Sequence, residues 1–231
     1  MKNTLSKIIL AVNIGTTALL FVLNYFYQIN NFDFTLKCVC SSLFTGIGIV
    51  NLAYALGTKQ KEKSFYISMA VALVFSLLGD IFIYYSFIAG AATFAISHIC
   101  FIITYCFIEK IKRLDLIIGA IFFAGATSFL LCPLVSFEEA VFKPVCIVYA
   151  LIISLMVGKA MGNYLRNRNI VNAVIAIASV LFFISDIMLV IQLFTEMWDY
   201  ANNACMAMYY PALCIFAFSM YLKICKSNIK Q

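Results

Sequence analysis

Long apolar runs, interrupted by short polar segments, fill almost the whole chain. A membrane-spanning helix needs about 20 mostly apolar residues, because each residue adds only about 1.5 Å along the helix axis. Eight runs meet this requirement, and the short connections between them make neighbouring helices antiparallel. The pattern therefore predicts an all-α polytopic membrane protein with spans at approximately 5–28, 34–56, 64–85, 87–108, 114–135, 142–164, 170–194 and 201–222.

The composition agrees with this prediction. Of 231 residues, 65% are hydrophobic and only 11% are charged, with a mean hydropathy of +1.01. A soluble domain is about 45–50% apolar and about 25% charged, so we expect one membrane domain over 1–231. The first run follows two lysines, as in a signal peptide. It extends to about Tyr27 without a convincing cleavage site, which favours a retained first helix.

Basic residues mark one side of the predicted bundle. All but three of the 16 lysines and arginines lie near the two chain ends or in the segments 57–63, 109–115 and 165–169, which follow even-numbered spans. The loops after odd-numbered spans carry the acidic residues Asp33, Glu138, Glu139, Glu196 and Asp199. By the positive-inside bias, both termini are predicted to be cytoplasmic. The net charge of +6 thus reflects topology and indicates no nucleic-acid partner.

The other three basic residues lie inside apolar runs, and two of them belong to a repeat. Lys143 follows Lys37 by 106 positions, each within a Lys-x-Val-Cys motif, and Asp186 follows Asp80 by the same 106 positions. We therefore predict two four-helix halves, 1–113 and 114–231, in parallel orientation, as in some transporters. The third residue, Lys159, lies near the inner end of its span and is expected to snorkel to the interface.

The repeat should bring four charges together in the outer half of the bundle. At about 1.5 Å per residue, the two lysines lie about 2–5 Å below the outer end, Asp80 about 7 Å and Asp186 about 12 Å. A charge inside a membrane costs at least about 2.5–3.5 kcal/mol, so such residues usually face the interior and mark function. Lys37, Asp80, Lys143 and Asp186 are therefore candidate site residues. His98, near mid-depth, is either a participant or a packing residue.

Several polar side chains could complete a site. Ser76, Asp80 and Tyr84 share one face of the third span at i, i+4 and i+8. The last span contributes Asn202, Asn203, Tyr209 and Tyr210, followed by Pro211, which predicts a local kink. One histidine and no H-E-x-x-H pattern indicate no metal site. Nine cysteines without a CxxC pair are typical of helix packing.

In their order and spacing, these motifs resemble those of the YhhN-like lysoplasmalogenase family. The matching elements are LLGD ending at Asp80 with Gly90 after it, F-x-x-x-H ending at His98, FFISD ending at Asp186, Lys-Pro at 143–144 and Tyr-Tyr at 209–210. The resemblance covers all eight spans. It implies a cofactor-independent membrane enzyme that hydrolyses the vinyl ether bond of lysoplasmalogens, giving a fatty aldehyde and glycerophosphoethanolamine or glycerophosphocholine. It assigns functional roles to Asp80, Asp186, His98, Lys37, Lys143 and Tyr210.

The chain departs from the family pattern at three positions. Cys38 occupies a position where proline is common, Phe101 one where tyrosine is expected, and Leu213 one where glutamine is expected. These changes bear on the hydrogen-bond network and on head-group preference. They leave both aspartates unchanged.

Vinyl ether hydrolysis needs a proton donor and a carboxylate or base that stabilises an oxocarbenium ion and directs water. This logic resembles the two-carboxylate arrangement of glycoside hydrolases. Two neighbouring aspartates in a low dielectric cannot both ionise easily, so either one could supply the acid. The lysines could keep the other carboxylate charged or bind the substrate phosphate. The expected partners are thus a lysophospholipid and water.

Two other classes of protein are compatible with the pattern. A small transporter or proton-coupled carrier would explain a parallel repeat with charges in both halves, although Pro144 and Pro211 are not repeat-related. A non-catalytic scaffold would use the charges only to hold the halves together. The short loops suit a bacterial cell membrane. The oligomeric state is not determined, because no clear GxxxG face is present.

Overall fold

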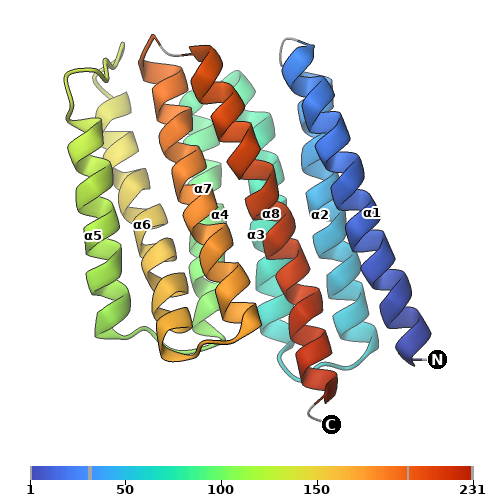
Figure 1. The fold of residues 1–231 in the computed structure, drawn as a ribbon. Coiled ribbons are helices and arrows are strands. Elements are labelled where there is room, and N and C mark those ends of the chain that lie inside the picture. The colour runs from blue at the N-terminus through green and yellow to red at the C-terminus, as the bar shows by residue number, and fades with distance from the viewer. Residues whose placement is uncertain (1, 31–32, 197, 230–231) are drawn as a thin grey trace.

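The chain forms a bundle of α-helices in a computed structural model that describes residues 2–30, 33–196 and 198–229 (Figure 1). Lys230, which contributes to the charge pattern, lies outside these ranges. Within them the structure has eight helices and no strand, and each helix is long and apolar enough to cross a membrane. The predicted polytopic fold is therefore confirmed. The helices are α1 Lys2–Ile29, α2 Phe34–Gly57, α3 Lys63–Tyr85, α4 Phe87–Cys106, α5 Arg113–Leu130, α6 Phe142–Arg166, α7 Ile170–Phe194 and α8 Trp198–Ile229.

Some predicted boundaries are wrong at helix ends. α5 ends at Leu130, five residues before its predicted end at 135, because Pro133 disfavours helical backbone at the residue before it. α8 continues to Ile229 as a polar helix well beyond the predicted end at 222, and Pro211 lies inside it without ending it. Hydropathy marks the edge of the apolar run, whereas a helix ends where its backbone conformation changes.

The helices lie in two layers with two peripheral helices. In Figure 1, α7 and α8 lie in front of α3 and α4, while α5 and α1 form opposite edges of the bundle. The edge helices are the least buried spans, and α8 is the most buried. α5 packs its backbone closely against α6, and α7 packs against α6 and α8.

The packing of the two halves is similar. The most extensive helix contacts join α3 to α4 and α7 to α8, which are equivalent pairs in the two halves. Between the halves, α4 packs on α6 and α8 packs on α2, which are again equivalent contacts. Duplication of a four-helix unit would give this pattern, and we propose that 1–113 and 114–231 are the two copies.

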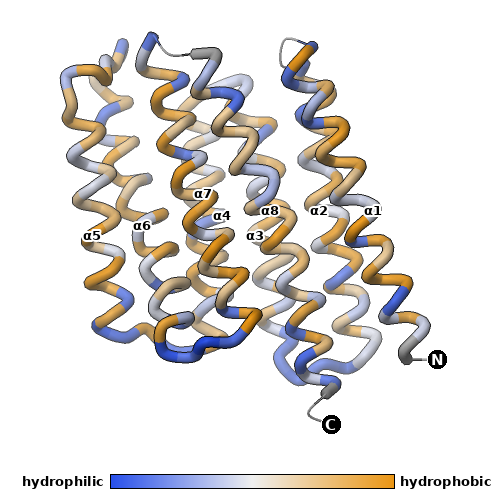
Figure 2. Tube along the Cα trace, viewed as in Figure 1, coloured by the Kyte–Doolittle hydropathy of each residue, from blue (hydrophilic) through white to orange (hydrophobic). Residues whose placement is uncertain are grey.

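The polar residues gather at the ends of the bundle. Figure 2 shows hydrophilic connections at the end where both termini lie and mostly hydrophobic positions along the helices. At this end Lys223 of α8 forms an ion pair with Glu62 and lies 4.8 Å from the centre of the Phe65 ring. The basic connections share this end, and its cytoplasmic assignment is a prediction from charge.

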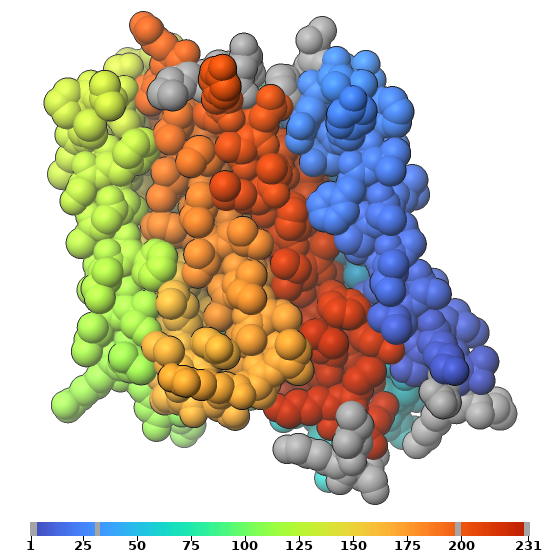
Figure 3. Space-filling view, in the orientation of Figure 1, coloured from blue at the N-terminus to red at the C-terminus, as the bar shows by residue number. Residues whose placement is uncertain are grey.

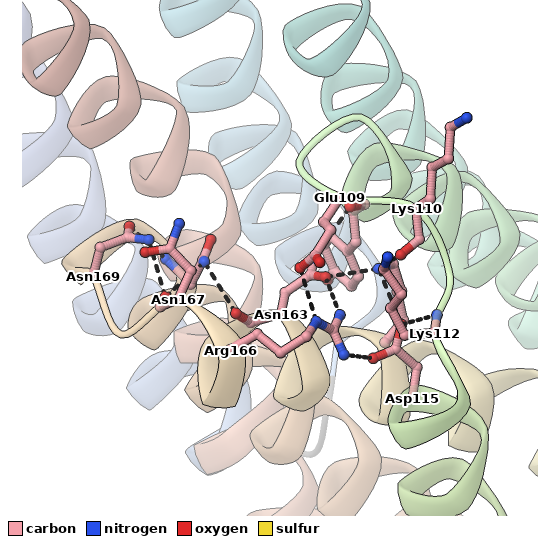
Figure 4. A network of polar contacts seen from close by, with 11 residues as sticks. Glu109, Lys110, Lys112, Asp115, Asn163, Arg166, Asn167 and Asn169 are labelled. Atoms are coloured by element: carbon pink, nitrogen blue, oxygen red, sulfur yellow. Dashed lines mark hydrogen bonds and ion pairs between the residues drawn. The ribbon is translucent and has the colours of Figure 1, made fainter.

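An ionic network joins α5 and α6 at this same end (Figure 4). Asp115 is 2% exposed and accepts hydrogen bonds from Nζ of Lys159 at 3.1 Å and from Nη1 of Arg166 at 2.5 Å. Arg166 also contacts Glu109 at 2.8 Å, and Lys159 donates to Asn163 at 2.7 Å. We call these five residues the inner ionic network.

The inner ionic network corrects one prediction. Lys159 does not snorkel to the interface, because its side chain is 2% exposed and is held by Asp115 and Asn163. Asp115 lies in the first turn of α5, within the predicted span 114–135, and its carboxylate accepts from the backbone N–H of Lys112 at 3.0 Å. A buried lysine is stable here because its partner carboxylate is buried beside it.

Candidate active site

Asp80 lies in α3 with its carboxylate almost fully enclosed. Its Oδ1 is 3.5 Å from Nζ of Lys37, and its side chain is 3% exposed. Its Oδ2 accepts hydrogen bonds from Ser41 at 2.5 Å and from Tyr209 at 2.7 Å. Both carboxylate oxygens are thus occupied, and one of their three partners is a cation.

Three helices build this environment. Lys37 and Ser41 are four residues apart on α2, so they lie on one face of that helix. Tyr209 comes from α8, which also packs against α2 and α3. Beside Asp80, Gly79 lets the ring of Phe94 approach, because a Cβ there would lie 2.8 Å from three ring atoms. The Asp80 carboxylate therefore connects both halves of the chain.

Asp186 lies in α7 and has different neighbours. Its Oδ2 accepts a hydrogen bond from the hydroxyl of Tyr149 at 2.5 Å and lies 3.3 Å from Nε2 of His98. The same Nε2 is 2.7 Å from the Tyr149 hydroxyl. The three side chains form a closed triangle of polar contacts from α4, α6 and α7. No lysine or arginine of the described residues forms an ion pair with Asp186.

The surroundings of His98 indicate which ring nitrogen carries hydrogen. The side chain is fully buried, and Nδ1 has no hydrogen-bond partner, whereas Nε2 faces two oxygen atoms. Because Tyr149 donates its own hydrogen to Asp186, Nε2–H is the donor toward the tyrosine oxygen. A second hydrogen on Nδ1 would be buried without an acceptor, which is costly. The geometry therefore favours neutral His98.

A layer of rings separates the two carboxylates. The Phe182 ring centre lies 4.7 Å from that of His98 and 5.4 Å from that of Tyr209. The thiol of Cys205, on α8, is within electrostatic range of both Asp80 and Asp186. The two aspartates thus belong to one region, but each has its own set of hydrogen-bond partners.

An apolar cavity of about 60 Å³ reaches Asp186. Its walls come from α3, α4, α5, α6 and α7, and they include Phe94, Ala150 and Val190. Among its described lining residues, only Asp186 and Tyr149 carry side-chain oxygen atoms, and Asp80 is not part of the lining. On the face shown in Figure 3, α5 and α7 lie side by side. The ring centres of Phe122 on α5 and Phe183 on α7 are 5.0 Å apart, and Phe183 lines the cavity.

Several predicted site residues do not reach the carboxylates. Lys143 is exposed and forms no ion pair within the described residues, so it does not join the expected group of four charges. Asn203 is exposed, whereas its neighbour Asn202 is buried. Tyr84 is 64% exposed and stacks on Phe34 at 4.3 Å, because it lies in the last turn of α3. These three residues face away from the buried polar groups.

Other predicted residues are buried nearby. Ser76 bonds to Ser97 at 2.8 Å and to the carbonyl of Ala72 at 3.2 Å, and it joins α3 to α4 without contacting Asp80. Tyr210 is fully buried, with its ring centre 5.2 Å from that of Tyr209. Three other predicted residues make direct polar contacts with the two aspartates. Lys37 and Tyr209 contact Asp80, and His98 contacts Asp186.

Sequence reasoning missed two residues of the site, Ser41 and Tyr149. Ser41 could have been found, because it is one helical turn after Lys37 and shares its face. Tyr149 is one tyrosine in an apolar run, and a single aromatic residue there is normally a packing residue. Only the packing of α6 against α4 and α7 gives it a role.

The donor set does not form a metal site. No cluster of three or more histidine, cysteine, aspartate or glutamate side chains occurs among the described residues. The two carboxylates instead use hydroxyl, imidazole and ammonium groups as partners.

Comparison with known proteins adds one finding. The model of the YhhN family matches residues 40–220, a range that contains both aspartates, His98, Tyr149 and Tyr209. The comparisons with curated proteins and with solved structures found no match.

Proposed function

This chain belongs to the YhhN family, and we propose that it is a membrane hydrolase that cleaves the vinyl ether bond of lysoplasmalogens. The products would be a fatty aldehyde and glycerophosphoethanolamine or glycerophosphocholine. The observation that carries the proposal is the position of Asp186 in the wall of an apolar cavity, with a second buried aspartate, Asp80, behind one layer of rings. The short connections between spans favour a bacterial cell membrane as its location.

The cavity supports an aliphatic substrate. Its lining is apolar except at Asp186 and Tyr149, so an alkenyl chain could replace lipid contacts with side-chain contacts. Asp186 is eight residues before the end of α7, or about 12 Å below the outer end at 1.5 Å per residue. A polar head group would then lie at the outer interface while the ether bond reaches the carboxylate.

The position of Lys143 favours contact with the substrate head group over an ion pair with Asp186. It is exposed at the start of α6, and two later residues of that helix, Tyr149 and Ala150, line the cavity. An exposed ammonium group binds a phosphate as a point charge. We assign Lys143 to the phosphate of the substrate and Lys37 to Asp80.

The reaction needs one acid and one stabilising carboxylate. The acid protonates the outer alkene carbon, and the carbon next to oxygen becomes an oxocarbenium ion. The second carboxylate stabilises this cation, and water attacks it to give a hemiacetal, which collapses to aldehyde and alcohol. The logic is that of glycoside hydrolysis by two carboxyl groups.

The test is aldehyde release by the purified protein in detergent. Lysoplasmalogens with each head group would be compared with a saturated alkyl ether lipid, which has no alkene to protonate. We expect aldehyde from the vinyl ethers only, and a loss of at least about 100-fold in Asp80→Asn and Asp186→Asn. No release by folded wild type with either head group would refute the proposal. Uptake of lipid into sealed vesicles without aldehyde release would favour a carrier.

A further inference from the structure

We infer that the two aspartates have different tasks: Asp186 is the carboxylic acid that transfers the proton, Tyr149 is its positioning residue, and Asp80 is the carboxylate that remains charged. This inference rests on the proposed function for its catalytic part. Its statement about which carboxyl group holds a proton can be tested without any activity.

Asp80 has the neighbours of an ionised group. Lys37 places an ammonium group 3.5 Å from Oδ1, and the hydroxyls of Ser41 and Tyr209 donate to Oδ2. The remaining titratable side chains that face it are Tyr27, Cys38, Cys40, Cys205 and Tyr210, and their ordinary neutral forms add no negative charge. Protonating Asp80 would leave Lys37 as an uncompensated charge beside a buried group.

Asp186 has the neighbours of a neutral acid. The titratable groups that face it are Tyr149 on α6, His98 on α4, and Cys205 and Tyr209 on α8, and Cys146 lines the same cavity. Among these, only His98 could become a cation, and its buried Nδ1 has no acceptor for a second hydrogen. A charged form of Asp186 would lie beside an apolar cavity with no lysine or arginine of the described residues paired to it, which is costly.

The hydrogen bonds also orient the acid. Tyr149 and His98 both approach Oδ2 of Asp186, so Oδ1 is the oxygen left to carry the transferable proton. Because Asp186 lines the cavity, we assign this oxygen to the contact with the substrate. After transfer, the charge develops on a carboxylate that already has two donors in place, which stabilises it without rearrangement.

The reaction needs no proton donor or acceptor other than Asp186, the substrate and water. The O–H bond of Asp186 breaks as a C–H bond forms at the outer alkene carbon, and the ether oxygen shares its electron pair with the cationic carbon. Water forms the new C–O bond and returns one proton to Asp186. In the hemiacetal, the hydroxyl proton moves to the glycerol oxygen as that C–O bond breaks. One water is consumed, and the enzyme regains its starting protonation state.

Infrared spectroscopy of the purified protein tests the protonation states directly. A protonated carboxyl group has a carbonyl stretching band separate from the carboxylate bands. We expect wild type and Asp80→Asn to show this band and Asp186→Asn to lack it. Its absence from wild type, or its loss in Asp80→Asn with retention in Asp186→Asn, would overturn the inference. Helical content and thermal unfolding of each variant verify that it is folded.

Tyr149→Phe tests the positioning role. Removing one hydrogen bond to a group that becomes charged should lower kcat by about 10- to 100-fold with little change in KM, and it should shift the carboxyl band. Tyr105→Phe is the control, because Tyr105 is also a tyrosine in a span and loses only its 3.1 Å bond to Ser179 outside the site. Equal effects of both variants on kcat would contradict the role of Tyr149.

These experiments distinguish failure of the proposed function from failure of the inference about the two carboxyl groups. If wild type releases no aldehyde but the carboxyl band is lost only in Asp186→Asn, the proposed function fails and the protonation states remain supported. If aldehyde is released and the band follows Asp80, the function is supported and the division of tasks is wrong.

Discussion

The ammonium nitrogen of Lys37 lies 3.5 Å from Oδ1 of Asp80, whereas Lys143, at the corresponding position of the second half, is exposed and lies in no ion pair within the described residues. The two halves therefore use the same motif differently. Asp80 in the first half pairs with a cation, whereas Asp186 in the second half contacts Tyr149 and His98.

Lys37→Met should destabilise the protein and remove its activity. The substitution leaves Asp80 as a buried charge with hydroxyl partners only, and losing one member of a buried ion pair costs about 3–5 kcal/mol. Thermal unfolding in detergent, followed by the loss of helical circular dichroism, measures this effect.

Lys143→Met is the matched control for stability. Because its side chain is exposed, the free energy of unfolding should change by no more than about 0.5 kcal/mol, while KM for the phospholipid rises.

A double variant, Lys37→Asp with Asp80→Lys, should remain inactive. Recovery of activity by this exchange would support the interpretation that the charges only hold the halves together.

Asp115→Asn should weaken the attachment of α5 to α6. It removes the carboxylate from two cations, Lys159 and Arg166, and should lower stability by about 3–5 kcal/mol. Turnover by the folded fraction should be unchanged, since the inner ionic network is at the end of the bundle opposite Asp186.

Glu109→Gln provides the comparison within the same network. Glu109 is 32% exposed, and its pair with Arg166 should contribute at most about 1 kcal/mol. Equal losses of stability in the two variants would mean that burial of Asp115 is not what gives the network its strength.

Gly158→Ala should force α5 and α6 apart. A Cβ at Gly158 would contact the carbonyl of Asp115 and lie 2.6 Å from the nitrogen and 2.8 Å from the Cα of Gly119. These are backbone atoms that cannot rotate away, so we expect a loss of about 1–3 kcal/mol. Gly125→Ala on α5 has nothing within 4 Å and should instead stabilise the helix by about 0.5–1 kcal/mol.

Ala150→Phe should shorten the alkenyl chain that the enzyme accepts. Ala150 is 6% exposed and lines the cavity, so a ring there occupies space that a long chain would use. We expect kcat/KM for long-chain substrates to fall by about 10- to 200-fold, with a smaller effect on short chains. Ala124→Phe, on the exposed face of α5, is the control. A loss independent of chain length would place the chain elsewhere.

The fold was predictable because every span is long and apolar enough to cross a bilayer and because the basic residues lie mainly on one side. Helix ends were less predictable. Asp115 lay in both the charged segment 109–115 and the predicted span 114–135, and no partner was predicted for it or for Lys159. Hydropathy is evaluated for each run separately, so it cannot predict a buried ion pair between two helices.

The site was predictable where the residue type alone is unusual in a membrane. Asp80, Asp186, Lys37 and His98 were identified for that reason, and each has a polar partner in the structure. Lys143 does not join the other charges, because equal spacing along the chain does not guarantee equal side-chain contacts. Tyr149 was missed because tyrosine is common in spans, and only the fold brings it to a carboxylate.

The inner ionic network also affects how the protein assembles in a membrane during synthesis. Asp115 lies in the first turn of α5, at the polar end of the bundle, so α5 can enter the bilayer while this carboxylate stays at the interface. The carboxylate loses its contact with water only when α6 brings Lys159 and Arg166 beside it. The ion pairs therefore belong to the packing step that follows insertion, and they fix α5, the shortest span, to the edge of the bundle.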